Sequence, residues 1–246
     1  NSNFLKNYIK KSIIKNAYGF FSSSESGDRY LLEYGAAMDK ITRYPFTSVL
    51  KNEISHNKIN YNKKEDLKEK YGVIEKKAVV TVGRFSYDGG YGKGFDVFAK
   101  IAKRFNSIGF YIVGDEPTNE FIKMKENFNI VNLHFLPFYK RKELFSLYQC
   151  FDCSVIFSRG DVWGLVVNES LANGIPVISS NKCTAGVELI KDGYNGYVVE
   201  INDLNCICNK IEDLLSCDYY DNCINSITAY TIENMVEIHL KELANK

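Results

Sequence analysis

SRGDVWGLVVNESLANGIPVISS, residues 158–180, is the stretch that decides the fold. Its second half, from Gly174 to Ser180, is a short apolar run behind turn residues, which is typical of a buried strand. Residues 153–157, just before the stretch, form another apolar run, and Gly164 stands where a helix can begin. The order is therefore strand, loop, helix and strand, which predicts one unit of an open α/β sheet.

Two acidic residues in this stretch, Asp161 and Glu169, have seven residues between them. A loop that follows a strand and leads into a helix is where open α/β sheets bind ligands. The free N–H groups of the helix start attract an anion, whereas carboxylates accept hydrogen bonds from hydroxyl groups. An anion seat flanked by hydroxyl acceptors suits a nucleotide sugar. The alternative is that both acids only stabilise a helix start, where Asp and Glu are common.

The same alternation of strands and helices continues through most of the chain. The expected strands are 78–82, 110–113, 131–135, 153–157, 176–179 and 196–199, with helices between them and after the last. Such alternation predicts a parallel sheet with right-handed crossovers, and six strands suit the doubly wound order 3-2-1-4-5-6. We therefore expect an α/β fold, a Rossmann-like doubly wound parallel sheet with a partial second α/β unit.

The partial unit comes from the start of the chain. Residues 1–50 show strand–helix–strand patterning that is too small to bury both faces of a sheet, and we expect them to be the end of a domain whose beginning is missing; the family resemblance given below implies the remnant of an amino-terminal Rossmann-like domain. Residues 51–76 are rich in lysine and poor in apolar residues, which predicts a linker with one helix at 64–71. Residues 77–228 then form the main domain, and 229–246 a C-terminal helix. Because the chain begins with Asn rather than Met, we expect a piece of a longer protein.

The composition excludes several classes of function. The 246 residues are 45% hydrophobic and 25% charged with a net charge of +1, so no nucleic-acid partner is expected. We expect no transmembrane segment and no signal peptide. Seven cysteines without a framework spacing indicate a reducing compartment, and hence the cytoplasm. Cys150 and Cys153 have C-x-x-C spacing but no second pair, so we expect buried thiols and no metal site. His239 lies on the apolar stripe of the last helix and is expected to pack.

A second loop supplies positive charge. VGRFSYDGGYGKGFD, residues 82–96, is rich in glycine but lacks a proper G-x-G-x-x-G pattern. Arg84 ends the first strand of the main domain, and Lys93 precedes the next helix. In the predicted order the first and fourth strands are neighbours, so both cations should approach Gly164 and Leu165 across the crevice. Two cations and a helix start can neutralise a diphosphate without a metal. The alternative is that both are solvated loop residues.

Together these segments resemble a known family. The segments are Val82–Arg84, Lys93–Asp96, Asp161–Ile178 and Asp192–Val199. Their combination is similar to the carboxyl-terminal domain of the retaining glycosyltransferase family 4, whose members have the GT-B fold of two Rossmann-like domains. The resemblance is strong over residues 77–200 and looser over 1–50, which are similar to the end of the family's amino-terminal domain. It implies that residues 77–228 bind a nucleotide-sugar donor.

The resemblance also implies roles for the basic groups. Arg84 and Lys93 would grip the donor diphosphate and stabilise charge on the leaving group. The backbone N–H groups of Leu165 and Val166 would meet the distal phosphate. The implied donor is a UDP-, GDP- or ADP-sugar, the anomeric configuration would be retained, and no metal or other cofactor would be needed.

Further roles follow from the same resemblance. Glu169 would bind the ribose hydroxyls, and Asp161, standing where the family usually has the first Glu of an E-x7-E pattern, would hold a sugar hydroxyl and act with the two cations in catalysis. The loop Pro137–Tyr139, which includes Phe138, would border the base, largely through backbone groups. Gly83 and Gly164 would complete the donor site. The shorter side chain of Asp161 retracts the carboxylate by one methylene, which bears on sugar preference or rate.

The acceptor side and two rival functions stay open. In the family, acceptor recognition and a catalytic histidine lie in the amino-terminal domain, most of which is absent from this sequence. The acceptor would be a glycan or a lipid-linked glycan, with peripheral membrane contact through that domain. One rival is a non-catalytic nucleotide-sugar binding module or inactive fragment. The other is a nicotinamide-dependent oxidoreductase, for which Asp115 supplies only the acidic residue after the second strand.

Overall fold

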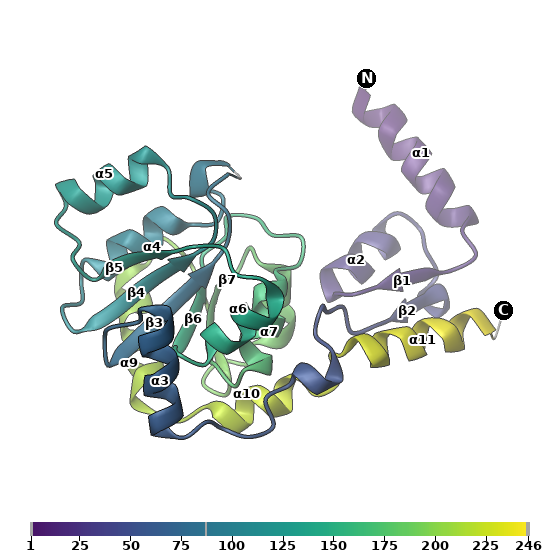
Figure 1. Ribbon diagram of the computed structural model, residues 1–246. Coiled ribbons are helices and arrows are strands. Elements are labelled where there is room, and N and C mark those ends of the chain that lie inside the picture. The colour runs from purple at the N-terminus through teal and green to yellow at the C-terminus, as the bar shows by residue number, and fades with distance from the viewer. Residues whose placement is uncertain (1, 87, 245–246) are drawn as a thin grey trace. The chain divides into compact units, whose positions relative to one another are not determined.

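The chain folds into two compact units. The computed structural model describes residues 2–86 and 88–244. Unit 1 joins Asn1–Ser48 with Ala229–Lys246, and unit 2 is Val49–Thr228 (Figure 1). By contact, the stretch 51–76 therefore lies inside unit 2. The assignment of donor and acceptor roles to these parts stays a prediction.

Unit 2 is built on a six-stranded parallel sheet. Its strands lie in the order β5-β4-β3-β6-β7-β8. Their bounds are β3 (Lys77–Val82), β4 (Ile108–Val113), β5 (Leu133–Leu136), β6 (Cys153–Ile156), β7 (Val177–Ser180) and β8 (Gly196–Val199). Counted from β3, this is the predicted order 3-2-1-4-5-6, which is confirmed. β3 and β6 are neighbours, so the loops that leave their carboxyl ends meet at the point where the strand order reverses.

Helices cover both faces of this sheet, as Figure 1 shows. α4 (Phe95–Ala102) and α9 (Leu204–Ser216) pack together on one face, and α3 (Tyr61–Tyr71) and α6 (Arg141–Tyr148) on the other. The remaining helices are α5 (Asn119–Asn127), α7 (Leu165–Ala172), α8 (Thr184–Leu189) and α10 (Tyr220–Ile227), with 3₁₀ turns η2 (Lys51–Glu53) and η3 (Asp88–Gly90). This two-sided cover is why the strands have apolar residues on both faces.

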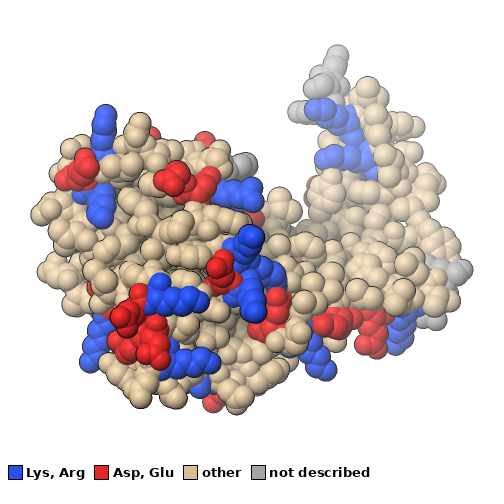
Figure 2. All heavy atoms as spheres, in the orientation of Figure 1, with Lys and Arg blue, Asp and Glu red and all other residues tan. Residues whose placement is uncertain are grey.

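The surface carries mixed charge. On the face drawn in Figure 2, acidic and basic side chains are interspersed over unit 2 and separated by uncharged residues. That face shows no continuous basic stripe of the kind that binds nucleic acid. None of the described helices has the length and apolarity needed to cross a membrane.

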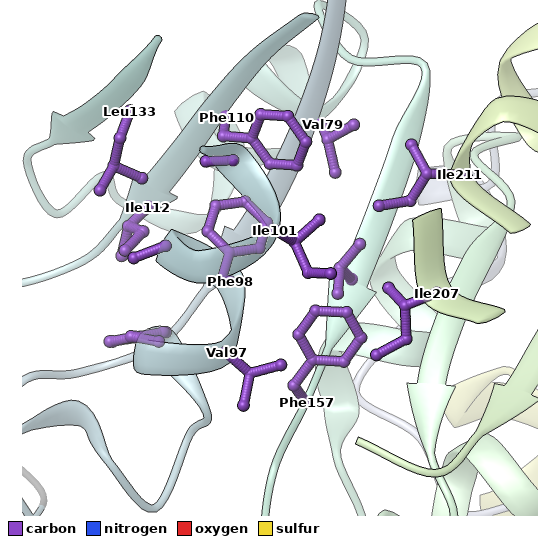
Figure 3. Packing of buried hydrophobic residues seen from close by; sticks show 14 of the residues in the cluster. Val79, Val97, Phe98, Ile101, Phe110, Ile112, Leu133, Phe157, Ile207 and Ile211 are labelled. Carbon is purple, nitrogen blue, oxygen red and sulfur yellow. The ribbon is translucent and has the colours of Figure 1, made fainter. Parts of the chain in front are cut away.

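The core follows the alternation of side chains along the strands. Val79, Phe110 and Ile112 point to one face and pack with residues of α4 and α9, among them Phe98, Ile101, Ile207 and Ile211 (Figure 3). Ala78, Val80 and Tyr111 point to the other face and pack with Leu147 and Tyr148 of α6. Each fully buried apolar side chain contributes roughly 1.5–3 kcal/mol relative to exposure, so these two layers hold the strand ends in fixed positions.

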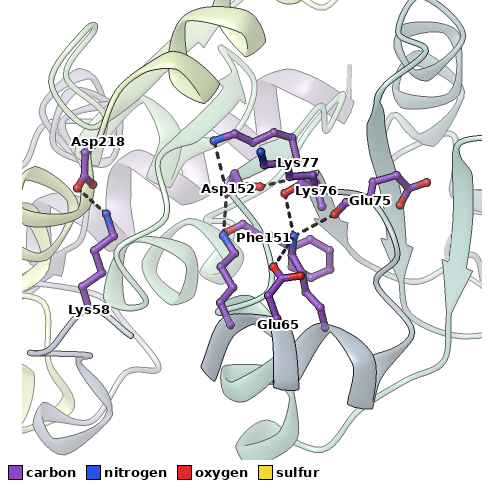
Figure 4. Close-up of polar contacts among 11 residues, drawn as sticks. Lys58, Glu65, Glu75, Lys76, Lys77, Phe151, Asp152 and Asp218 are labelled. Atoms are coloured by element: carbon purple, nitrogen blue, oxygen red, sulfur yellow. Dashed lines mark hydrogen bonds and ion pairs between the residues drawn. The ribbon is translucent and has the colours of Figure 1, made fainter. Parts of the chain in front are cut away.

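Polar contacts fasten α3 to the amino ends of the strands, which we call the amino edge (Figure 4). Lys64 Nζ lies 2.7 Å from Asp152 Oδ1, and the other oxygen of Asp152 accepts the backbone N–H of Ala78 at 2.9 Å. Lys68, with a side chain only 4% exposed, donates to the carbonyl groups of residues 75 and 76. The helix in the stretch expected as a linker is therefore tied to the sheet of unit 2. It begins earlier than predicted, at residue 61, because the side chain of Asn60 caps it.

Unit 1 is the expected partial α/β unit. It contains α1 (Ser2–Asn16), β1 (Phe20–Ser22), α2 (Glu25–Glu33), η1 (Met38–Lys40), β2 (Ile41–Arg43) and α11 (Ile232–Ala244), and β1 and β2 pair in parallel. β2 ends two residues before Pro45, which cannot donate to a ladder. His239 of α11 stacks on Phe21 with ring centroids 4.1 Å apart, which confirms that this histidine packs.

Candidate functional site

The loop after β3 is held close to the end of β4. The backbone N–H of Gly83 donates to the carbonyl of Val113 at 3.0 Å, and a Cβ on Gly114 would overlap the carbonyl oxygen of Gly83. Asp115 accepts the backbone N–H groups of Phe85 and Ser86. Burial acts to raise the pKa of Asp115, but these hydrogen bonds outweigh it and hold the pKa below its usual value. Asp115 thus shapes the loop that carries Arg84.

The start of α4 presses against the end of β6. Gly94 precedes the helix with φ of +73°, and a Cβ there would overlap the carbonyl group of Phe157. Only glycine fits this left-handed conformation and close approach. Next to it, Lys93 Nζ lies 2.8 Å from Asp161 Oδ2. The predicted meeting of the β3 loop with the β6 loop is therefore present.

A second ion pair ties these two loops together. Arg159 binds Asp96 through two parallel hydrogen bonds of 2.7 and 2.9 Å, and its guanidinium also donates to the carbonyl of Tyr91. The carboxylate of Asp96 is only 6% exposed. Burial acts to raise the pKa of Asp96, and the hydrogen bonds from Arg159 outweigh it and lower the pKa. Sequence reasoning missed Arg159, although it lies in the stretch that decides the fold.

The loop before α7 is fixed by backbone contacts. Asp161 donates its N–H to the carbonyl of Lys182 at 3.0 Å. Trp163 is buried and donates to the side chain of Asn168 at 2.8 Å. Gly164 then starts α7 with φ of +99°, where a Cβ would overlap the sulfur of Cys183. No side chain of the described residues caps this helix start, so its first N–H groups are available to an anion.

These loops surround one cavity of about 590 Å³ at the carboxyl ends of the strands, which we call the carboxyl edge. Six of the residues predicted for the site line it: Gly83, Arg84, Lys93, Phe138, Asp161 and Val166. Its size suits a bound nucleotide. Tyr139, from the loop predicted to border the base, also lines it, and Leu144 adds apolar wall that the sequence did not predict. Gly164, Leu165 and Glu169 are not among the lining residues: the first two form the helix start itself.

Glu169 faces α6. It lies in the second turn of α7, and its side chain is 13% exposed. Tyr148 Oη donates to Glu169 Oε2 at 3.3 Å, and Arg141 Nη1 lies 3.6 Å from Glu169 Oε1. Burial raises the pKa of Tyr148 well above its usual value, and the nearby carboxylate acts in the same direction. Tyr148 is therefore a neutral donor to Glu169.

With this geometry in view, comparison with known proteins identifies the family. The family model described as "Glycosyl transferases group 1" matches residues 62–230. The chain belongs to this family. The match includes every element that surrounds the carboxyl-edge cavity.

Curated relatives of this glycosyltransferase family are distant. An uncharacterized glycosyltransferase of Methanocaldococcus jannaschii is 27% identical over 221 residues, which are 85% of this chain and 55% of the relative. One of Haemophilus influenzae is 27% identical over 157 residues, 61% of this chain and 42% of the relative. An uncharacterized 41.2 kDa protein in the cps region of Klebsiella pneumoniae is 30% identical over 133 residues, 53% of this chain and 35% of the relative. The chain thus spans between about a third and just over half of these relatives.

Several solved structures share the fold. A glycosyltransferase from Rickettsia africae ESF-5 matches with a TM-score of 0.80 at 20% identity, covering 96% of this chain and 65% of its own. Anabaena HepE in complex with UDP matches with a TM-score of 0.78 at 16% identity, covering 98% and 68%. Sucrose-phosphate synthase from Thermosynechococcus elongatus matches with a TM-score of 0.77 at 18% identity, covering 99% and 63%. The α/β architecture is therefore that of GT-B glycosyltransferases.

Proposed function

We propose that this chain is the donor-binding half of a retaining, metal-independent glycosyltransferase of family 4. It would transfer a hexose-type sugar from a nucleoside diphosphate to an acceptor glycan or glycolipid. One observation carries the proposal: Arg84, Lys93, Asp161 and Val166, the second residue of α7, line a single cavity at the switch point of the sheet. This is where doubly wound folds bind nucleotides.

The cations and the helix start suit a diphosphate. Arg84 and Lys93 come from the loop after β3, and Val166 is the second residue of α7. When the bond between sugar and phosphate breaks, negative charge develops on the leaving nucleoside diphosphate. Positive groups already aimed at that point stabilise the transition state more than the ground state. We propose that these groups perform the task that a divalent metal performs in other transferases.

The ion pair between Lys93 and Asp161 would give way to the donor. The two side chains lie 2.8 Å apart and neutralise each other. A diphosphate carries more negative charge than one carboxylate, so it attracts Lys93 more strongly. Asp161 then becomes free to accept a hydrogen bond from a hydroxyl of the donor sugar, the role we propose for it.

The other end of the cavity suits a nucleoside. Phe138 and Tyr139 lie in the loop after β5 and present aromatic surface to the cavity. Burial raises the pKa of Tyr139, so its hydroxyl stays protonated at neutral pH. We propose that this loop borders the base and that Glu169 accepts hydrogen bonds from the ribose.

The named relatives support the substrate class. HepE structures contain UDP, and one contains UDP-glucose. Another structural neighbour is WaaG, which is involved in lipopolysaccharide biosynthesis, matching with a TM-score of 0.68 at 15% identity, 90% of this chain and 60% of its own. We propose a nucleotide-sugar donor and a saccharide acceptor of polysaccharide or lipopolysaccharide biosynthesis on this basis.

Thermal unfolding with a panel of nucleotides tests the donor assignment. We expect UDP, GDP or ADP to raise the melting temperature, because a ligand that binds only the folded state stabilises it. The corresponding nucleoside, which lacks phosphate, should give little shift. Equal shifts from nucleoside and nucleoside diphosphate would contradict a phosphate site. Binding of a nucleotide sugar without its transfer or hydrolysis would favour a non-catalytic module.

A further inference from the structure

Arg141 lies beside Glu169, the carboxylate that we propose binds the ribose. Arg141 opens α6 and Tyr148 closes it. Seven residues make about two helical turns, so both side chains project from the same side of the helix. Both reach Glu169, Tyr148 through a hydrogen bond of 3.3 Å and Arg141 at 3.6 Å. One face of α6 is thus turned toward one carboxylate of α7.

A second carboxylate fixes the guanidinium of Arg141. Arg141 Nε and Nη2 donate to the two oxygens of Glu53, each at 2.7 Å. Glu53 is itself held by the backbone N–H of Leu50 at 2.8 Å. The hydrogen bonds from Arg141 lower the pKa of Glu53, so this carboxylate is charged at neutral pH. A two-pronged contact of this kind sets the plane of the guanidinium as well as its distance.

Glu169 is nearly enclosed beside α6. Its side chain is only 13% exposed, and an unpaired charge in such a place is costly. Arg141 supplies the compensating charge from 3.6 Å, which is too long for a normal hydrogen bond. A cation held at this distance compensates the charge of the carboxylate and restricts where it can lie.

We propose that Arg141 is a positioning residue for nucleotide recognition: held by Glu53, it orients Glu169 so that the site distinguishes a ribose from a deoxyribose. The proposal rests on the donor-binding function proposed above. It extends the site to a residue that lies outside the lining of the cavity. Arg141 acts through Glu169 and needs no contact with the ligand.

Calorimetric titration of paired ligands tests this role. The probes are UDP, GDP and ADP, and the 2′,3′-dideoxy form of whichever binds the native chain most tightly. Hydrogen bonds to a charged group contribute about 1.5–3 kcal/mol each, so we expect the native chain to prefer the ribose form by at least about tenfold. Arg141→Gln should reduce that preference to less than about threefold while the affinity for the dideoxy form stays the same. Arg141→Lys should restore part of the preference.

Two further variants separate positioning from a general effect. Lys142→Gln removes the same charge from the next residue of α6, whose side chain is exposed, and should keep the native preference. Glu53→Gln loosens the guanidinium and should lower the preference even if Arg141→Gln does not fold. The proposal is overturned if Arg141→Gln and Glu53→Gln keep the native preference, or if they weaken ribose and dideoxy forms equally. If the native chain binds none of the three nucleotides, the proposed function itself fails.

Discussion

Lysine and aspartate side chains occur at both edges of the sheet in unit 2, but they serve different purposes at the two edges. At the amino edge, three lysines line a cavity of about 320 Å³, and each pairs with an aspartate: Lys58 with Asp218, and Lys64 and Lys77 with Asp152. At the carboxyl edge the cavity is about 590 Å³, and its described lining contains one such pair, Lys93 with Asp161, together with a second cation, Arg84.

The two edges also differ in the backbone groups that lie beside the charged side chains. The carboxylate of Asp152 also accepts the backbone N–H that begins β3, so the amino-edge pairs are part of the framework. At the carboxyl edge, the start of α7 has no side-chain cap among the described residues. The lesson is that lysines and aspartates in a cavity do not by themselves make a site. A site also needs N–H groups that no side chain caps, as at the start of α7.

The largest expected effect comes from two glycines with the same backbone conformation at different edges. Gly94 has φ of +73° and no room for a Cβ, whereas Gly72, which ends α3, has φ of +71° and nothing within 4 Å. Gly72→Ala should lower the free energy of unfolding by about 1–2 kcal/mol, the cost of a left-handed alanine. Gly94→Ala should lower it by more than about 3 kcal/mol, because the loop must also move away from β6. Urea denaturation measures both.

Equal losses for the two glycine variants would mean that the start of α4 is not pressed against β6. That result would remove the reason for Lys93 to lie beside Asp161.

The next effect separates binding from stability. Lys93→Ala should weaken nucleoside diphosphate binding about 10- to 100-fold, because it removes a charged hydrogen bond worth about 1.5–3 kcal/mol. Its effect on the free energy of unfolding should be small. Lys64→Ala should do the reverse: Asp152 is 16% exposed and keeps one cation among the described residues, Lys77 at 3.9 Å, so we expect a loss of about 1–2 kcal/mol in stability. Titration calorimetry measures the binding affinity of each variant, and urea denaturation measures its free energy of unfolding.

The distinction between the amino edge and the carboxyl edge is contradicted if Lys64→Ala weakens nucleotide binding as much as Lys93→Ala does. The amino-edge cavity would then be part of the binding site.

A smaller effect concerns the ion pair between Arg159 and Asp96, which ties the loops after β3 and β6 together. The folded protein binds fewer protons at Asp96 than the unfolded chain, since hydrogen bonds from Arg159 lower its pKa against the opposing effect of burial. This contribution is present above the unfolded pKa of about 3.9 and is lost as the pH falls through the lowered pKa. Asp96→Asn should therefore cost about 1 kcal/mol at pH 7, and the difference from the native chain should shrink below about pH 4. Denaturation at several pH values measures it, and a constant difference would contradict it.

Much of this fold could be predicted because buried strands and helices place apolar residues at regular positions in the sequence. The apolar runs of β3, β4 and β7 are buried on both faces, and the strand order follows from their alternation with helices. Arg84, Lys93 and Asp161 could be placed because each lies at the end of a predicted strand or the start of a helix. Their meeting follows from the neighbourhood of β3 and β6.

The polar contacts between distant segments could not be predicted. Arg159 and Asp96 are 63 positions apart, and Arg141 and Glu53 are 88 apart. Such pairs depend on where loops come to rest after the core has formed, and no repeat in the sequence marks them. Arg159 and Arg141 were therefore missed, whereas the charged residues that line the cavity, Arg84, Lys93 and Asp161, were predicted.

A crystal structure of this chain with a nucleoside diphosphate tests the central claim most directly. We predict that the phosphates lie at the carboxyl edge, within hydrogen-bonding distance of Arg84, Lys93 and the first N–H groups of α7, and that Lys93 has left Asp161. A nucleotide bound in the amino-edge cavity, or at the carboxyl edge with its phosphates away from Lys93 and α7, would contradict the account.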